Sequence, residues 1–184
     1  MKTLLKGGTV VSAAGSRAAD VLVDGEKIAA VGEGLAADGA NVVDVSGKLL
    51  FPGFIDAHIH LESSLVSPTS FARAVLPHGT TTVITDPHEI ANVCGMGGID
   101  YMMAATENLP LDVHFMLPSC VPAMAFEENG ATLTWRDINA YFDHPRVLGL
   151  AEMMNYPGVM MGDRATMEKI CLLYTSDAAD DLIG

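Results

Sequence analysis

Apolar and polar side chains alternate strictly over residues 55–60, which follow Pro52-Gly53 and Phe54, and Phe54 falls on the same face as Asp56. Successive side chains of a β-strand point to opposite faces, so the pattern predicts a strand with one apolar and one polar face. Asp56, His58 and His60 share the polar face. Two imidazoles two residues apart can reach one metal ion, and they suit Zn, Fe, Ni and Cu, with carboxylate partners extending the range to Mn. The alternative is an ordinary polar strand end, but burying this cluster without a cation would be costly. We therefore favour a metal site.

Short β-rich runs separated by glycines predict a small all-β unit over residues 1–50. Gly7-Gly8 is expected to separate two of its strands, and Asp24-Gly25 predicts a hairpin because its turn needs positive φ values. The charged residues of this unit are expected to lie in solvent. No constellation of catalytic residue types occurs in it.

After His60 the pattern changes to alternating strands and helices. Three further strands are expected, at Thr80–Thr85, Asp112–Leu117 and Val147–Ala151. Three helical regions are expected between and around them, one starting at Ser67-Pro68, one within Ile90–Asn108, and one from Thr134 to about Phe142. This alternation predicts a parallel sheet with right-handed crossovers, and hence an α/β fold.

Composition limits the class of protein. The chain has 184 residues, of which 49% are hydrophobic and 18% charged, as in a soluble globular protein. A net charge of -13 argues against a nucleic-acid partner, which requires a surplus of Lys and Arg. The three cysteines form no C-x-x-C pair, which favours a reducing compartment over a cysteine zinc site. We find no signal-peptide pattern or membrane span, so we expect no membrane partner and a cytoplasmic protein.

Polar side chains follow each of the four predicted strands. They are Glu62, Ser63 and Ser64 after the first, Asp86, His88 and Glu89 after the second, Ser119 and Cys120 after the third, and Glu152 after the fourth. A carboxylate such as Glu152 can bridge two divalent ions, although it could also be a loop carboxylate at a helix start. We interpret the remaining histidines, His78, His114 and His144, as structural.

Five segments carry a family resemblance. They are residues 53–64, 74–82, 86–92, 116–122 and 149–155. The first resembles the metal-binding first strand of the amidohydrolase superfamily, and together the five resemble its bacterial adenine deaminases, over residues 1–170. The resemblance implies a (β/α)8 TIM-type barrel flanked by a β-sandwich made of N- and C-terminal segments. It also implies hydrolysis of adenine to hypoxanthine and ammonia in purine salvage.

The same resemblance implies roles for particular residues. Metal ligands would be His58, His60 and Glu152; catalytic residues would be Glu152, His88 and Asp86; the substrate pocket would include Glu62, Ser63, Glu89 and Ser119. Two divalent ions are implied, with Mn²⁺ or Fe²⁺ favoured and Zn²⁺ as the alternative. The partners are adenine and water, and a homodimer of the full-length parent is left open.

The chain is expected to hold about half a barrel, because a complete one needs about 250 residues. We assign residues 1–50 to the N-terminal part of the β-sandwich and 51–170 to the first half of the barrel, with about four strands. Residues 171–184 resemble a translated sequencing adapter and are expected to be a non-native tail, the alternative being a genuine helix end. The family's later histidine ligands and late aspartate are absent, so this fragment is expected to be inactive.

Other functions stay open at this point. One is a different amidohydrolase, acting on a cyclic amide or an N-acetyl sugar, and another is a non-catalytic truncated fragment. The unrelated zinc base deaminases use an H-x-E motif with P-C-x-x-C. His60-Leu61-Glu62 mimics the first motif, but no C-x-x-C follows, so this class is excluded.

Overall fold

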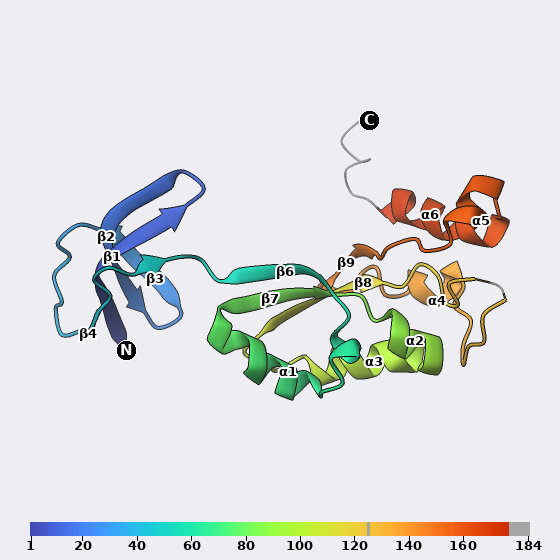
Figure 1. Cartoon of the computed structure of the whole chain (residues 1–184), viewed down its shortest axis with the longest axis horizontal. Coiled ribbons are helices and arrows are strands. Elements are labelled where there is room, and N and C mark those ends of the chain that lie inside the picture. The colour runs from blue at the N-terminus through green and yellow to red at the C-terminus, as the bar shows by residue number, and fades with distance from the viewer. Residues whose placement is uncertain (125, 177–184) are drawn as a thin grey trace. The chain divides into compact units, whose positions relative to one another are not determined.

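The structure is a computed structural model that describes residues 1–124 and 126–176. It divides the chain into two compact units, Met1–Phe54 and a second that begins at Ile55. The first unit is a five-stranded sheet in the order β3-β2-β1-β4, with β5 also paired to β1 (Figure 1). Its strands are β1 (Lys2–Ser12), β2 (Gly15–Asp24), β3 (Lys27–Gly32), β4 (Asn41–Asp44) and β5 (Leu49–Leu50).

The prediction that Gly7-Gly8 separates two strands is wrong. Both glycines lie within β1, where the pairing with β2 changes register between Leu5 and Gly8. Gly7 has φ +80, and a Cβ at this position would lie 2.6 Å from Ser46 Oγ. Glycine is therefore needed for a bulge inside one long strand.

The expectation that charged residues of this unit lie in solvent is wrong at Asp20, which is buried. Its Oδ1 accepts a hydrogen bond from the Gly7 N–H at 2.8 Å, and its Oδ2 accepts one from the Leu35 N–H at 3.0 Å. The predicted hairpin is confirmed, because Asp24 pairs with Lys27 in the antiparallel β2–β3 ladder.

The second unit contains a four-stranded sheet in the order β6-β7-β8-β9, in which β7–β8 and β8–β9 are parallel. The strands are β6 (Phe54–Ile59), β7 (Thr80–Thr85), β8 (Asp112–Leu117) and β9 (Val147–Leu150). The α-helices are α1 (Pro68–Val75), α2 (His88–Cys94), α3 (Met96–Ala105), α4 (Trp135–Asn139), α5 (Tyr156–Met161) and α6 (Arg164–Ser176). Two 3-10 turns, Leu61–Ser64 and Leu76–His78, flank α1.

Two predicted helix starts are confirmed, whereas the region expected within Ile90–Asn108 holds two helices, α2 and α3, the first of which already begins at His88. Ser67 caps α1, its side chain accepting from the Ser70 N–H, and proline is the first residue of that helix. Thr134 and Asp137 form the predicted capping box of α4. The α4 helix ends at Asn139, earlier than predicted, and hydrogen-bonded turns continue the chain from there.

The core of this unit packs the sheet against α1 and α3, which run along one side of it (Figure 1), and extends to residues of α4 and α6. Its fully buried members come from strands and helices alike, among them Val83, Ile99, Phe115, Leu117 and Ile138. The outer strands β6 and β9 are less covered, since Ile55 is 64% and Leu148 53% exposed. Among the described residues, no helix combines the length and apolar character needed to cross a bilayer.

Two predictions reach beyond what the structure describes. The predicted non-native tail overlaps the last turns of α6, which runs to Ser176, and residues 177–184 lie outside the described residues. The first unit contains one sheet among its described residues, so the predicted sandwich stays a prediction.

Candidate metal centre

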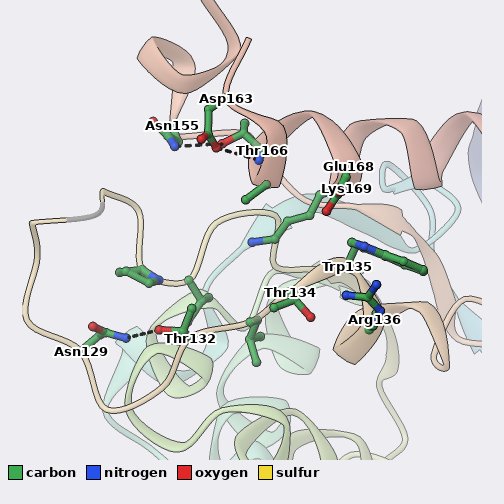
Figure 2. Close-up of a pocket in the computed structure, with 14 residues that line it drawn as sticks. Asn129, Thr132, Thr134, Trp135, Arg136, Asn155, Asp163, Thr166, Glu168 and Lys169 are labelled. Carbon is green, nitrogen blue, oxygen red and sulfur yellow. Dashed lines mark hydrogen bonds between the residues drawn. The ribbon is translucent and has the colours of Figure 1, made fainter. Parts of the chain in front are cut away.

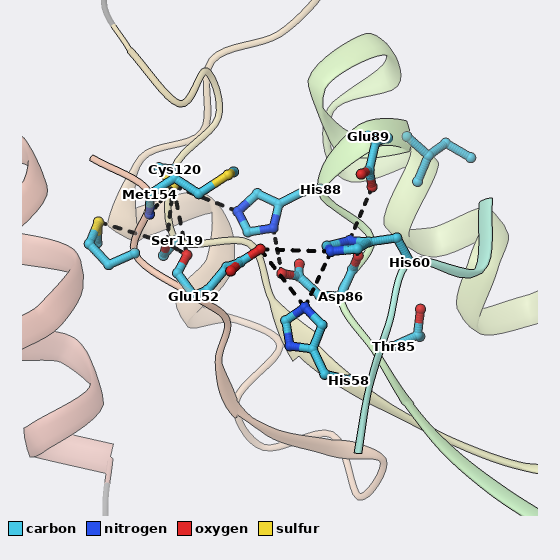
Figure 3. Close-up of polar contacts among 12 residues, drawn as sticks. His58, His60, Thr85, Asp86, His88, Glu89, Ser119, Cys120, Glu152 and Met154 are labelled. Atoms are coloured by element: carbon cyan, nitrogen blue, oxygen red, sulfur yellow. Dashed lines mark hydrogen bonds and ion pairs between the residues drawn. The ribbon is translucent and has the colours of Figure 1, made fainter. Parts of the chain in front are cut away.

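Four potential metal ligands from three strand ends meet at one edge of the sheet (Figure 3). His58 lies in β6 and His60 directly follows it, Asp86 directly follows β7, and Glu152 lies two residues beyond β9. Each offers one ligand atom, and these atoms all lie within 4.8 Å of one another. We call these four residues the ligand cluster.

The spacing of the cluster suits a metal ion. The Nε2 atoms of His58 and His60 lie 3.2 Å apart, and they lie 3.8 and 3.7 Å from Oε1 of Glu152. Metal–ligand bonds of about 2.1 Å place neighbouring ligand atoms about 3.0–3.4 Å apart. The three atoms therefore need to move little to surround one cation.

The ring of His60 is oriented by its other nitrogen. Nδ1 lies 2.8 Å from the backbone oxygen of Asp86 and 3.2 Å from Oε2 of Glu89. Because only a protonated Nδ1 can donate to a carbonyl, this contact favours the tautomer whose Nε2 carries a free lone pair. His60 thus presents a metal-binding nitrogen to the cluster.

Asp86 supplies the clearest sign that the cluster fits a cation. Its side chain is 1% exposed, and Oδ2 lies 2.6 Å from Nδ1 of His88. Its other oxygen, Oδ1, is buried and has no hydrogen-bond partner among the described residues. A buried carboxylate oxygen without a partner is costly, and a bound cation would satisfy it. Two imidazoles and two carboxylates suit Mn, Fe or Zn.

His88 is held between Asp86 and Cys120, whose Sγ lies 3.7 Å from His88 Nε2. Burial alone would lower the pKa of His88, but its hydrogen bonds to Asp86 and Cys120 and their charges raise that pKa to about 9. Burial likewise opposes ionisation of the Cys120 thiol, but hydrogen bonds from His88 and Ser119 leave its pKa lowered. Sequence analysis missed this Cys–His–Asp row, since no local spacing links Cys120 to His88.

Ser119 and Cys120 anchor the segment that carries Glu152. The Ser119 hydroxyl donates to the Glu152 backbone oxygen at 2.5 Å, and the Met154 N–H donates to Cys120 Sγ at 3.2 Å. Ser119 is 1% exposed. Its hydroxyl is therefore committed to the backbone at Glu152, a contact that sequence analysis did not predict.

The other three predicted pocket residues, Glu62, Ser63 and Glu89, line a cavity of about 410 Å³ beside α2. Glu62 Oε1 accepts from the Ile90 N–H at 3.2 Å, while its Oε2 is buried without a partner among the described residues. Burial raises the pKa of the Glu62 carboxyl, and the nearby charge of Glu89 adds to this effect. Glu62 is therefore a partly buried carboxyl group with a raised pKa at this cavity.

The histidines interpreted as structural lie outside the ligand cluster. His78 is exposed in a 3-10 turn, His114 lies in β8, and His144 accepts from the Arg146 N–H in a turn. Asp56 is also outside the cluster, and its carboxylate accepts from the His58 N–H at 3.3 Å.

Sequence comparison gives the chain a family and relatives. The model of the Amidohydrolase family matches residues 49–174. An adenine deaminase of Clostridium acetobutylicum is 55% identical over 153 residues, which are 83% of this chain and 26% of that protein. An adenine deaminase of Bacillus velezensis is 46% identical over 170 residues, 91% of this chain and 29% of that protein. The chain thus spans roughly a quarter of the length of these relatives.

Solved structures resemble the chain at lower identity. A D-hydantoinase from Bacillus sp. AR9 is 26% identical with a TM-score of 0.59, over 80% of this chain and 32% of that one. An atrazine chlorohydrolase from Arthrobacter aurescens, solved with zinc, is 21% identical with a TM-score of 0.59, over 80% of this chain and 46% of that one. The second likeness concerns the fold alone.

Proposed function

The chain belongs to the amidohydrolase family, and from this premise we propose that its second unit forms part of an adenine deaminase active site. The reaction is the hydrolysis of adenine to hypoxanthine and ammonia, in purine salvage. The observation that carries the proposal is the ligand cluster at the ends of β6, β7 and β9. The choice of adenine is supported by relatives that are named adenine deaminases and are 46–58% identical to this chain.

His58, His60, Asp86 and Glu152 would hold the metal, with Glu152 shared between two ions. We favour Mn²⁺ or Fe²⁺, with Zn²⁺ as the alternative, because the donors are imidazole and carboxylate. When bound, divalent cations lower the pKa of water and polarise the bond to be hydrolysed. Asp86 enters this set as a ligand because of its unpartnered Oδ1.

The catalytic residues of this proposal are Asp86, His88 and Glu152. Departure of the amine requires a proton, which a positioned side chain can deliver. We assign this transfer to the Asp86–His88 pair, which holds a proton between Nδ1 and Oδ2 at the edge of the ligand cluster. The hydrogen bond to His88 engages Oδ2 of Asp86, so that Oδ1, which has no partner among the described residues, can serve the ligand cluster.

Glu62, Ser63 and Glu89 are proposed to bind the purine. Adenine presents both ring nitrogens that accept hydrogen bonds and N–H groups that donate them. A carboxyl whose pKa is raised, such as Glu62, can donate when protonated, and the carboxyl oxygens of Glu89 offer acceptors. Ser119 is instead proposed to position Glu152, because its hydroxyl already donates to the backbone there.

We further propose that residues 51–170 form the first half of a (β/α)8 barrel and residues 1–50 part of a flanking β-sandwich. Exposed apolar side chains on the outer strands, such as Ile55 and Leu148, support additional strands on both sides. A cytoplasmic location and a homodimer of the full-length parent remain predictions.

A cyclic-amide hydrolase is the second candidate, and the likeness to D-hydantoinase structures at 25–31% identity favours it. Its hydantoinase-like members are expected to carry a carboxylated lysine after the fourth strand. This chain has Glu152 there instead, and no lysine follows β9 before Arg164. We therefore rank adenine above hydantoin as substrate.

A hybrid enzyme tests the proposed function. The 153 residues of this chain that align with the Clostridium acetobutylicum relative would replace the matching segment of that protein. We expect the hybrid, loaded with Mn²⁺, to release ammonia from adenine and to leave hydantoin intact. Replacement of His88 by Asn in the hybrid should reduce turnover about 10²-fold or more if the pair transfers a proton.

The matched control is the hybrid carrying His78→Asn, which alters an exposed histidine that does not belong to the ligand cluster. It should keep the activity of the parent hybrid. A folded, metal-loaded hybrid that hydrolyses hydantoin but not adenine would favour the second candidate and refute the first.

A further inference from the structure

A larger cavity lies between α6 and the segment that links β8 to α4 (Figure 2). Its volume is about 460 Å³, and no member of the ligand cluster lines it. Small organic ligands bind in cavities of about 300–1,000 Å³. The space therefore has the size for such a ligand and is separate from the site described above.

Lys169 of α6 points its ammonium group into this cavity (Figure 2). Lys169 is 8% exposed as a whole residue, and no hydrogen bond or ion pair joins its Nζ to any residue that the structure describes. Burial lowers the pKa of Lys169, as expected when an ammonium group leaves water. A buried cation without a partner is costly, and an anion beside it would offset the cost.

The acidic groups nearest to Lys169 are already engaged elsewhere. Asp163 Oδ2 accepts from the Thr166 N–H and hydroxyl at 2.9 and 2.8 Å. Asp137 Oδ2 accepts from the Thr134 N–H and hydroxyl, both at 2.7 Å. Cys120, Asp137 and Asp163 all act on Lys169 through charge interactions without a hydrogen bond or ion pair, and Cys120 has the largest effect of the three. The ammonium group is therefore available to a ligand.

The remaining wall of the cavity combines an aromatic face with apolar side chains. Trp135, Val121, Pro122 and Leu133 line the cavity. The guanidinium carbon of Arg136 lies 4.7 Å from the centre of the Trp135 ring. Glu168, which also lines it, is paired with Arg164 at 2.8 Å. The cavity thus offers a largely buried lysine without an ion partner, in a wall where Trp135 and apolar side chains lie among polar ones such as Thr132 and Asn155.

We propose that this cavity binds a small organic carboxylate, with Lys169 as the ion partner and Trp135 against the organic part. A single negative charge matches the Lys169 ammonium group, which is the largely buried one of two cationic groups at the cavity without an ion pair, the exposed Arg136 being the other. Inorganic phosphate carries more charge, has no apolar part, and would lie beside Asp163 and Glu168. It fits this cavity less well.

Titration of the full 184-residue chain with benzoate tests the proposal. Trp135 is the only tryptophan of the sequence, so its fluorescence reports on this cavity, and calorimetry gives the affinity independently. Benzamide has the same ring without the charge and is the matched probe. We expect saturable benzoate binding that is at least about 30-fold tighter than that of benzamide. Equal binding of the two, or tighter binding of inorganic phosphate than of benzoate, would overturn the proposal.

The variant Lys169→Met should lose about 30-fold in benzoate affinity, whereas Lys27→Met, which changes an exposed lysine of β3, should bind as the parent does. Unchanged binding by Lys169→Met would refute the assignment. If that variant is misfolded by circular dichroism, acetylation of Lys169 in the parent chain decides, read by mass spectrometry. Benzoate should slow this acetylation several-fold, and the same rate with and without benzoate would refute the assignment.

Discussion

His88 Nδ1 lies 2.6 Å from Asp86 Oδ2, and both side chains are almost completely buried. This contact keeps one oxygen of Asp86 occupied and leaves the other, Oδ1, for the ligand cluster. It also makes the free energy of unfolding depend on pH. Burial opposes the charged imidazole, but Asp86 and Cys120 outweigh it and raise the pKa of His88 from 6.5 to about 9.

A raised pKa in the folded state means that His88 stabilises the metal-free chain fully below about pH 6.5 and that this stabilisation is lost as the pH rises through about 9. Cys120, with its lowered pKa, contributes in the opposite direction, so the measurement belongs in a Cys120→Ser background. There, urea unfolding should show a loss on the order of 2 kcal/mol between pH 6 and pH 10 that His88→Gln removes. The same pH slope with and without His88→Gln would contradict this account.

Ser119→Ala should weaken Mn²⁺ binding to the chain about tenfold, because it frees the backbone oxygen that positions Glu152. The cost to the free energy of unfolding should be about 1 kcal/mol, the typical net contribution of a hydrogen bond, since this one is only partly buried. Ser12→Ala, which removes a hydroxyl that donates to a backbone oxygen in the first unit, is the control and should leave Mn²⁺ affinity unchanged. Equal Mn²⁺ affinities for all three proteins would show that Ser119 does not position Glu152.

The sequence predicted much of the local structure correctly because the signals were local. The run of β-branched residues at Thr80–Thr85 is bounded by Gly79 and Asp86, and β7 occupies those residues. Ser67-Pro68 carries its own capping signal for α1. Such patterns depend on neighbours in the chain, and the fold preserves them.

Contacts between distant residues were not predictable in this way. Cys120 meets His88 across 32 positions, and no spacing rule joins them. Asp20 is buried only because Gly7 and Leu35 donate to it from other parts of the first unit. These contacts depend on strand register and loop path, which a pattern of apolar and polar residues does not specify.

The ligand cluster was partly predictable. The alternation in β6 placed His58 and His60 on one face, and their Nε2 atoms do meet. Asp86 was expected at a strand end and was assigned to catalysis, because the direction of its Oδ1 depends on the contact with His88. The position of each residue along its strand predicted that these side chains lie at one edge of the sheet. The direction in which each side chain points could be read only from the structure.

Glu152→Gln should lower the number of Mn²⁺ ions bound per chain, since the amide keeps the size of the side chain but removes the charge shared between two cations. Equilibrium dialysis followed by elemental analysis measures this number. Glu107→Gln makes the same change at an exposed residue of the α3–β8 connection and should leave the number as in the parent. An unchanged number in Glu152→Gln would show that Glu152 does not bridge two ions.

The most direct test of the account is Mn²⁺ binding by the His58→Ala/His60→Ala double variant, measured by electron paramagnetic resonance of free and bound ion. The parent chain should bind Mn²⁺, and the double variant should lose at least about 100-fold in affinity, because two nitrogens leave the cluster. The His78→Ala/His144→Ala double variant should bind Mn²⁺ as the parent does. Parent-like Mn²⁺ binding by His58→Ala/His60→Ala would contradict the metal centre proposed here.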